Sequence, residues 1–371
     1  MEDRLGIDLV ELRRIALPLV VPFRTSAGTI AVRDLLLVRI EAEGTEGWGE
    51  CVALPEPTYS PEDVAGAHRV LREHLVPRLL AAGDVSAADT TAVLSAVRGH
   101  PMAKTALELA LLDAAGRATA TPLATRLGAT RTHVDSGVSV GLFPPAELLA
   151  QVAAYVAAGY RRVKLKIGPG ADVDVVAAVR SAHPDLPLQV DANAAYTVAD
   201  ATPLSRLDAF DLILIEQPLP DDDLLGHAAL ARDLRTPICL DESITSLDTA
   251  ETALALGACR IVNVKAGRVG GYLHAVRLHD VCVARGVPVW CGGMLETGIG
   301  RAANVALAAL PGFTLPGDLS ASDRYYERDV VTEPFVLHDG RLTVPTGPGL
   351  GVTVDTAFVE SVTTAVDVLR P

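Results

Sequence analysis

The sequence predicts an α/β protein in which a (β/α)₈-type (TIM-like) barrel is combined with an α+β capping domain. Three observations lead to this fold class. Eight short aliphatic runs recur downstream of position 130, alanine- and leucine-rich segments with helical spacing separate them, and the first 130 residues lack this repeat. Strands that alternate with helices indicate βαβ units and a parallel sheet, and eight such units fit a closed barrel. An open α/β sheet is the alternative, although open sheets usually have fewer strands.

The predicted barrel occupies residues 131–325. Helices are expected between its strands, for example over 146–160 and 247–258, where apolar residues recur with helical spacing. The expected strands are VDSGVSVG (134–141), RRVKLKIG (161–168), LPLQVDAN (186–193), FDLILIEQP (210–218), TPICLDES (236–243), CRIVNVKAG (259–267), VPVWCGG (287–293) and GFTLPGD (312–318).

The segments on either side of the barrel are expected to form the capping domain. Residues 7–20 and 34–50 predict an antiparallel strand pair or meander, with a turn at PFRTSAGT (22–29) between them. The tail contains short β-type runs and glycine turns. We therefore assign residues 1–130 to an N-terminal α+β capping domain, and residues 326–371 to a C-terminal segment that returns to it.

Composition and charge narrow the class of protein. The chain has 371 residues, of which 49% are hydrophobic and 21% charged, as expected for a globular protein. Its formal net charge of -14 argues against partners such as nucleic acid or an anionic membrane surface. No run approaches the ~18 apolar residues that span a bilayer. No G-x-G-x-x-G follows an early strand and no phosphate-binding P-loop occurs, so the sequence gives no support for a dinucleotide-binding or P-loop protein.

The cysteines and the N-terminus predict a cytoplasmic protein. The first twenty residues carry charges throughout and do not resemble a signal peptide. The five cysteines are widely spaced and form no C-x-x-C pair, which favours unpaired thiols in a reducing compartment. They are Cys51, Cys239, Cys259, Cys282 and Cys291.

Three acidic residues follow three successive predicted strands. Asp191, Glu216 and Asp241 stand at intervals of 25 and 25 residues. The carboxyl ends of barrel strands form one rim, so the three carboxylates should converge there. A divalent cation would offset their repulsion, and all-oxygen ligation favours Mg²⁺ over Zn²⁺, with Mn²⁺ or another divalent cation able to substitute. The alternative is that these acids pair with lysines or cap the following helices.

Lysines occupy the second and sixth predicted strands. Lys164 and Lys166 alternate with aliphatic residues and therefore share one strand face. On an edge strand that face would meet water, whereas in a closed barrel it faces inward. Strands two and six lie opposite each other in an eight-stranded ring, so Lys166 and Lys265 should flank the barrel mouth. An ammonium near other cations has a pKa below its free value of ~10.4, which suits a general base. Lys164 would lower the pKa of Lys166 in this way, and it would also meet a substrate carboxylate.

The sequence resembles the o-succinylbenzoate synthase/N-acylamino acid racemase family of the enolase superfamily along nearly its whole length. The motifs that carry the resemblance are PFRTS, EGWGEC, VKLKIGPG, QVDAN, IEQPL, CLDESI, IVNVKAGRVGG, WCGGMLETGIG and GDLSASDRYY. The resemblance implies that Asp191, Glu216 and Asp241 bind Mg²⁺, and that Lys166 and Lys265 are an acid/base pair.

The resemblance also implies an enolase-like arrangement, in which capping-domain loops close over the substrate. The loops lie around Phe23 and Tyr59. A substrate pocket is then expected at Ser139 and Asn193, with Asp318 as a weaker candidate. Three further pocket residues are expected in one segment: Gly292, Gly293 and Met294.

The expected reaction is abstraction of a proton α to a carboxylate. The resemblance to this family implies one of two such reactions, or both. The first is Mg-dependent dehydration of 2-succinyl-6-hydroxy-2,4-cyclohexadiene-1-carboxylate in menaquinone biosynthesis. The second is racemisation of N-acylamino acids such as N-succinylamino acids. Alternatives are a dipeptide epimerase, a muconate cycloisomerase, and a non-catalytic metal-binding barrel. The expected partner is a small-molecule carboxylate, and members of the family are commonly oligomers, so a homo-oligomer is expected.

Overall fold

The barrel is built on one curved sheet of seven parallel strands. The structure, a computed structural model, describes residues 3–25, 28–170, 172–200 and 204–371. Hydrogen bonding orders the strands β11-β10-β9-β8-β7-β6-β5. Their bounds are β5 (Gly137–Val140), β6 (Arg162–Lys166), β7 (Leu188–Asp191), β8 (Ile215–Glu216), β9 (Ile238–Leu240), β10 (Ile261–Val264) and β11 (Val289–Cys291). Consecutive strands are neighbours, as βαβ repeats require.

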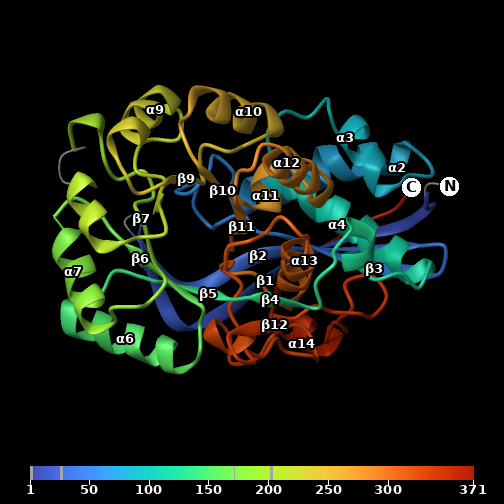
Figure 1. Cartoon of the computed structure of the whole chain (residues 1–371). Helices are drawn as coiled ribbons and strands as arrows, with labels where there is room; N and C mark the ends of the chain where they lie inside the picture. The colour runs from blue at the N-terminus through green and yellow to red at the C-terminus, as the bar shows by residue number, and fades with distance from the viewer. Residues whose placement is uncertain (1–2, 26–27, 171, 201–203) are drawn as a thin grey trace.

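Helices follow these strands and lie around the outside of the sheet (Figure 1). They are α6 (Pro145–Ala157), α7 (Val173–Ala182), α9 (Leu224–Asp233), α10 (Leu247–Leu256), α11 (Ala266–Val269), α12 (Tyr272–Ala284) and α13 (Gly298–Ala308). Short 3₁₀ turns lie at η3 (Val198–Asp200), η4 (Arg206–Phe210) and η5 (Ser322–Arg324). The helices expected over 146–160 and 247–258 correspond to α6 and α10.

The eighth aliphatic run closes the ring without forming a strand of its own. On one side the carbonyl oxygen of Gly317 accepts a hydrogen bond from the Gly137 amide at 2.7 Å. On the other side the Asp318 amide donates to the Cys291 carbonyl oxygen at 2.9 Å. Pro316 has no amide hydrogen to donate, so this segment cannot make a continuous ladder. The barrel is therefore closed by isolated bridges at this position.

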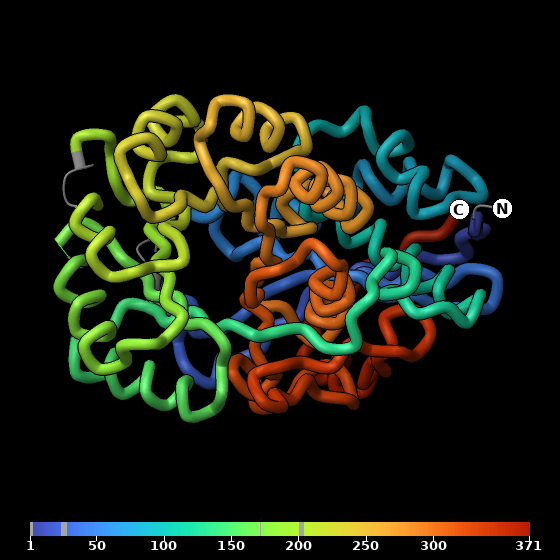
Figure 2. The backbone as a smooth tube through the Cα atoms, viewed as in Figure 1, coloured from blue at the N-terminus to red at the C-terminus, as the bar shows by residue number. Residues whose placement is uncertain are grey.

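An antiparallel sheet of four strands, in the order β13-β1-β2-β3, forms the core of the second unit. Its strands are β1 (Ile7–Thr25), β2 (Gly28–Ala42), β3 (Thr45–Cys51) and β13 (Thr363–Leu369). β1 extends into the segment 22–29, where a turn was expected, and its last residue, Thr25, pairs with Gly28 of β2. Residues 26–27 of that turn lie outside the described residues. The pairing of β1 with β13 brings both chain ends to one edge of the molecule (Figure 2).

A group of helices covers this sheet. They are α1 (Val64–Val70), the π-helix η1 (Leu71–Leu75), α2 (Val76–Ala81), η2 (Ala87–Asp89), α3 (Thr90–Val93), α4 (Pro101–Ala118) and α5 (Leu123–Leu127). Among them, α4 packs on β3 and β2, and α1 packs on β2. Two glycines of β3 let α4 approach closely, because a Cβ at Gly47 or Gly49 would overlap the backbone of Ala110 or Ala106. The same two glycines are part of the EGWGEC motif.

The C-terminal segment contacts both units. β12 (Arg341–Thr343) pairs with β4 (His133–Asp135), and α14 (Thr356–Ser361) leads into β13. The pairing of β13 with β1 places the end of the chain in the N-terminal sheet. The boundaries at residues 130 and 325 stay a prediction. Within the described residues, no helix combines the length and the apolar character needed to cross a membrane.

Candidate active site

The charged face of β6 points into the barrel. Lys164 is in register with Ser139 of β5 and Gln189 of β7, and Lys166 is in register with Asp191. Lys164 is buried, with 3% of its surface exposed. Because β6 lies inside the sheet and not at an edge, the interpretation of these lysines as a solvent-facing guard is wrong.

A cavity of about 590 Å³ lies where the barrel meets the capping unit. Barrel residues, adjacent parts of β1 and β2, and the loop between β3 and α1 line it together. The predicted site residues among its lining are Phe23, Tyr59, Ser139, Lys164, Lys166, Asp191, Asn193, Lys265, Gly293, Met294 and Asp318. Glu216, Asp241 and Gly292 are not lining residues, but each contacts a lysine that is. The structure therefore brings all the predicted site residues to one region.

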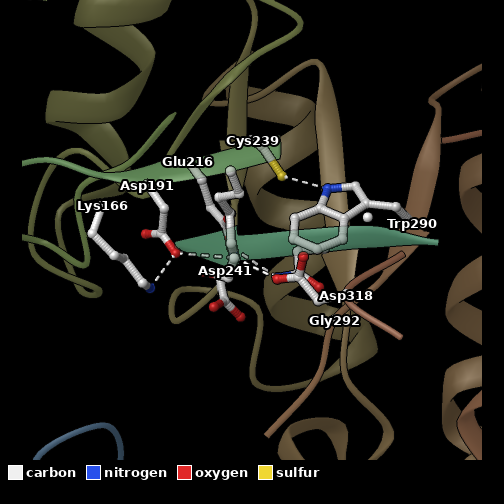
Figure 3. A network of polar contacts seen from close by, with 12 residues as sticks. Lys166, Asp191, Glu216, Cys239, Asp241, Trp290, Gly292 and Asp318 are labelled. Atoms are coloured by element: carbon white, nitrogen blue, oxygen red, sulfur yellow. Dashed lines mark hydrogen bonds and ion pairs between the residues drawn. The ribbon is translucent and has the colours of Figure 1, made fainter. Parts of the chain in front are cut away.

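Two of the acids face the lysines of β6. The Lys166 ammonium lies 2.7 Å from Oδ2 of Asp191, as Figure 3 shows. Lys164 reaches Oε2 of Glu216 at 3.0 Å and Oδ2 of Asp191 at 3.1 Å. Asn193 accepts a hydrogen bond from Lys166 through Oδ1 at 2.5 Å. Asp191, Glu216 and the two lysines thus form one ion-paired group on adjacent strands.

Asp241 meets the lysine on the opposite side. Its Oδ2 accepts a hydrogen bond from Lys265 Nζ at 2.9 Å, and Oδ1 accepts one from the Tyr59 hydroxyl at 3.0 Å. Arg268, from α11, also pairs with Asp241. Lys265 Nζ lies 4.4 Å from the centre of the Tyr59 ring. A residue of the capping loop and a barrel lysine therefore share one carboxylate.

A tight glycine segment gives Lys265 its space. A Cβ on Gly292 would come within 2.6 Å of Lys265 Cε and 2.8 Å of its Cγ. A Cβ on Gly293 would come within 2.5 Å of the Asp318 carbonyl oxygen. The chain can pass this close to Lys265 only because these residues carry no side chain.

Beneath the pocket, a buried cationic group packs on Trp290. Arg162 and Lys164 both contact Asp318, at 2.6 and 2.7 Å. The Arg162 guanidinium and the Lys164 ammonium lie 5.1 and 5.0 Å from the Trp290 ring centre. Trp290 donates to Cys239 Sγ at 3.3 Å, and the two side chains are seen together in Figure 3. Asp318 therefore holds Arg162 and Lys164 in place, besides lining the cavity.

The pKa values of Lys164 and Lys265 are raised, whereas neighbouring cations were expected to lower the pKa of a lysine in this site. Burial by itself lowers the pKa of Lys164, but the charges of Asp318, Glu216 and Asp191 outweigh it and raise this pKa above its ordinary value. Burial also lowers the pKa of Lys265, but Tyr59, Glu242 and Glu216 together outweigh this effect and raise the pKa. The prediction from the sequence counted only the neighbouring cations, which lower the pKa of a lysine, and left out the acids that contact it.

The three acids fit a hard divalent cation by their chemistry. Asp191, Glu216 and Asp241 are buried, lie on or directly after successive strands, and offer only oxygen donors. Among the described residues, no group of three His, Cys, Asp or Glu side chains is already arranged to hold a metal ion. Each acid is instead turned toward a lysine, as the alternative interpretation of these acids expected. Their role as metal ligands stays a prediction.

Glu242, next to Asp241, adds a fourth carboxylate. Its Oε1 accepts a hydrogen bond from Asn193 Nδ2 at 2.9 Å, whereas its Oε2 is buried without a partner among the described residues. Burial raises the pKa of Glu242 to about 7. An unsatisfied carboxylate oxygen beside the acid cluster is consistent with a site built for a cationic ligand.

Sequence reasoning missed several residues of the site. Arg162 alternates with Lys164 and Lys166, so the same strand period could have placed it inside the barrel. Asn263 precedes Lys265 by two residues, so the strand period could have placed it inside too, and it donates to Glu216 at 2.8 Å. Arg268 gave no comparable signal, because it acts from a short helix. Cavity residues from the capping unit, such as Ile30, could be found only from the folded arrangement.

Comparisons with known proteins agree with this geometry. The family described as "Mandelate racemase / muconate lactonizing enzyme, N-terminal domain" matches residues 10–128, and "Enolase C-terminal domain-like" matches residues 147–358. The chain belongs to the enolase superfamily. Sites of this superfamily combine a lysine or histidine base with one or two Mg²⁺ ions.

Relatives within the enolase superfamily cover nearly the whole chain. An N-succinylamino acid racemase from an Amycolatopsis species is 59% identical over 96% of this chain and 97% of its own. An o-succinylbenzoate synthase from Geobacillus kaustophilus is 49% identical over 97% and 96%. An L-Ala-D/L-Glu epimerase from Bacillus subtilis is 28% identical over 92% and 95%. The crystal structure of an enolase superfamily member from Listeria innocua has a TM-score of 0.95, at 41% identity and 99% coverage of both chains.

Proposed function

We propose that this chain abstracts the proton α to a substrate carboxylate, as an o-succinylbenzoate synthase, as an N-acylamino acid (N-succinylamino acid) racemase, or as both. The observation that carries the proposal is the placement of Lys166 and Lys265. They reach one cavity from β6 and β10, which are four strands apart. Two amines on opposite sides of a substrate can remove a proton from one face and act on the other.

Both reactions use the same two side chains. In the dehydration, Lys166 takes the α proton and returns it to the departing hydroxide, so that water leaves. Lys265, as a cation on the opposite face, stabilises the negative charge that develops on the substrate. In the racemisation, one lysine removes the α proton and the other delivers a proton to the far face. The α carbon then ends with the opposite configuration.

Asp191, Glu216 and Asp241 would hold Mg²⁺, with Mn²⁺ or another divalent cation as substitutes. When bound, the metal supplies positive charge that stabilises the substrate's carboxylate as negative charge develops on it. Lys164 lies between Asp191, Glu216 and the cavity, so its ammonium is placed to meet the same substrate carboxylate. We also propose that the lysines leave these acids when the acids bind the metal.

The capping loops would exclude water from the reacting centre. Phe23, Ile30 and Leu54 come from the N-terminal unit and, with Met294 of the barrel, form the apolar part of the cavity lining. Apolar walls strengthen the electrostatic interactions within the site. We expect a small-molecule carboxylate to bind there as the substrate.

Other reactions of the superfamily receive less support. The dipeptide epimerase relative shares 28% of its residues with this chain, against 59% and 49% for the racemase and the synthase. A muconate lactonizing enzyme from Pseudomonas fluorescens is 26% identical. A non-catalytic barrel would have no need for lysines on both sides of the cavity.

We further propose that the protein is a cytoplasmic homo-oligomer without nucleic-acid partners.

The proposal is tested by comparing rates on a substrate panel with saturating Mg²⁺. The panel contains the succinyl-hydroxycyclohexadiene carboxylate, an N-succinylamino acid, an Ala-Glu dipeptide and muconate. We expect turnover of at least one of the first two substrates, at a kcat/KM well above that for the last two. Turnover restricted to the dipeptide or to muconate would contradict the proposal. The ratio of the first two rates decides between synthase and racemase.

A further inference from the structure

Gln217 directly follows Glu216 at the end of β8 and is fully buried. Its backbone has a φ of +37°, in the left-handed region that residues other than glycine seldom adopt. A strained residue of this kind persists only where its surroundings determine its conformation. Nothing in the chemistry proposed above uses this side chain.

The side chain of Gln217 binds the loop that carries Asp241. Its Oε1 accepts hydrogen bonds from the amides of Asp241 and Ser243, at 3.0 and 3.2 Å. Its Nε2 donates to the Ser243 hydroxyl at 2.7 Å and to the Leu219 carbonyl oxygen at 3.0 Å. The amide group is thus fully engaged, with no donor or acceptor left for a substrate.

The backbone of Gln217 binds the loops on both sides. Its amide donates to the Cys239 carbonyl oxygen of β9 at 2.9 Å. Its carbonyl oxygen accepts from the Ala194 amide, three residues after Asp191, at 2.8 Å. Ala194 is itself in the left-handed region, with a φ of +60°. One residue therefore joins the three chain segments that carry Asp191, Glu216 and Asp241.

We propose that Gln217 is a positioning residue that sets the mutual placement of these three carboxylates and thereby the affinity of the site for a divalent cation. The inference rests on the proposed function, since it takes the three acids as Mg²⁺ ligands. Groups that orient metal ligands typically contribute about 10- to 100-fold to metal affinity. Without the Gln217 side chain, the buried amides of Asp241 and Ser243 would lose their acceptor, and the loop would move to find another.

The test is the dissociation constant of Mg²⁺, measured by calorimetry on the purified full-length protein without substrate. Gln217→Met keeps the volume of the side chain but makes none of its four hydrogen bonds. We expect it to weaken Mg²⁺ binding by about 10- to 100-fold. Should Gln217→Met fail to fold, Gln217→Asn takes its place, because asparagine tolerates a positive φ but is too short to span both amides.

Asp113→Ala is the matched control for loss of a buried hydrogen-bonding side chain. Asp113 joins three segments too, accepting from the amides of Trp48 and Leu350 and pairing with Arg117, but it lies on α4, outside the cavity and the three acids. We expect this variant to have a lower Tm and an unchanged Mg²⁺ dissociation constant.

The outcomes separate this inference from the proposed function. Weaker Mg²⁺ binding in the Gln217 variant alone supports the inference. If the Gln217 variant binds Mg²⁺ within twofold of the unmodified chain, the inference is overturned and the proposed metal site stays in place. If Asp113→Ala loses as much Mg²⁺ affinity as the Gln217 variant, the loss reflects general destabilisation, and the inference is overturned as well. If the unmodified chain binds no Mg²⁺, the proposed metal site fails, and the inference fails with it.

Discussion

At the scale of single residues, the site depends on the period of two along its strands. Lys164 and Lys166 face inward because Val163, Leu165 and Ile167 are buried on the other face of the same chain segment. A shift by one residue would exchange the two faces and place both ammonium groups among helices. The strand period thus decides which side chains can reach the substrate.

Replacing either lysine should stop turnover without unfolding the protein. Lys166→Ala and Lys265→Ala each remove one of the two amines that act on the substrate, and groups that transfer a proton contribute about 10²–10⁴-fold to rate. We expect kcat to fall by about 10²–10⁴-fold, and the circular dichroism spectrum to stay that of the unmodified chain. Steady-state kinetics on the preferred substrate give the answer. Retained activity in both variants would refute the two-lysine proposal.

Gly292→Ala should lower the rate by displacing Lys265. The new methyl group would overlap the lysine stem, and a displacement of about 1 Å in an acid/base group can cost about 10²-fold in rate. Gly168→Ala is the control, since a Cβ there meets nothing within 4 Å. Measurement of kcat for both variants tests this account of the glycine. Equal rates in Gly292→Ala and the unmodified chain would show that Lys265 does not need this space.

The sequence predicted the acids and lysines because each stands at a strand end or on a strand face, where periodicity fixes direction. Arg268 and Gln217 were not predictable in this way. Arg268 lies on a short helix after β10, and Gln217 acts through a strained backbone that no composition or spacing reveals. The contacts between lysines and acids also escaped prediction, because side-chain pairing depends on rotamers and not on strand period.

At the scale of elements, buried glutamates join the capping unit to the barrel helices. Glu50, at the end of β3, accepts from the Thr297 and Gly300 amides at the start of α13, at 3.1 and 2.9 Å. Glu108 of α4 accepts from the Tyr272 amide at the start of α12. The first amides of a helix lack partners within it, so these carboxylates satisfy them. Burial raises the pKa of Glu50 to about 7 and that of Glu108 to about 8.

These glutamates should make the fold less stable as the pH rises. The folded protein keeps a proton on Glu108 up to about pH 8, whereas the unfolded chain loses it near pH 4.5. Between these values unfolding releases the proton, so the free energy of unfolding falls with rising pH. In Glu108→Gln we expect this slope to be smaller, by up to about 1.4 kcal/mol per pH unit. Urea unfolding at pH 5, 6, 7 and 8 measures it, and identical slopes would contradict the assignment.

The sequence predicted the parallel strands of the barrel better than its closure. Seven aliphatic runs form strands, because each is short, β-branched and followed by a helix. The eighth contains Pro316 and a glycine on each side of its centre, so it closes the ring with isolated bridges. In the N-terminal unit, the chain reverses within the predicted turn at 22–29, but the turn is shorter than expected, because β1 extends to Thr25, which pairs with Gly28 of β2.

At the scale of the whole molecule, the active site exists only where two units meet. The acids and lysines come from the barrel, whereas Phe23, Tyr59 and Leu54 come from the N-terminal unit. Tyr59 links the two directly, through Asp241 and Lys265. Neither unit by itself would enclose the cavity.

Removal of divalent cations should abolish activity reversibly. With excess chelator we expect no detectable turnover, since no divalent cation would stabilise the negative charge that develops on the substrate carboxylate, and the lysines would stay paired with the acids. Added Mg²⁺ should restore the rate, and Mn²⁺ should do so at least in part. Full activity in the presence of chelator would contradict a metal-dependent reaction.

The oligomeric state is a separate prediction. We expect light scattering of the purified protein to give a multiple of the chain's mass at micromolar concentration. A single-chain mass at every concentration would contradict the prediction of a homo-oligomer.

The most direct test of the central claim is exchange of the substrate α hydrogen in deuterated water, followed by NMR with an N-succinylamino acid. Our account predicts incorporation of deuterium at the α carbon with Mg²⁺, and none when the metal is chelated or when both lysines are replaced. Absence of exchange with every N-succinylamino acid tested, together with no dehydration of the cyclohexadiene carboxylate, would contradict it.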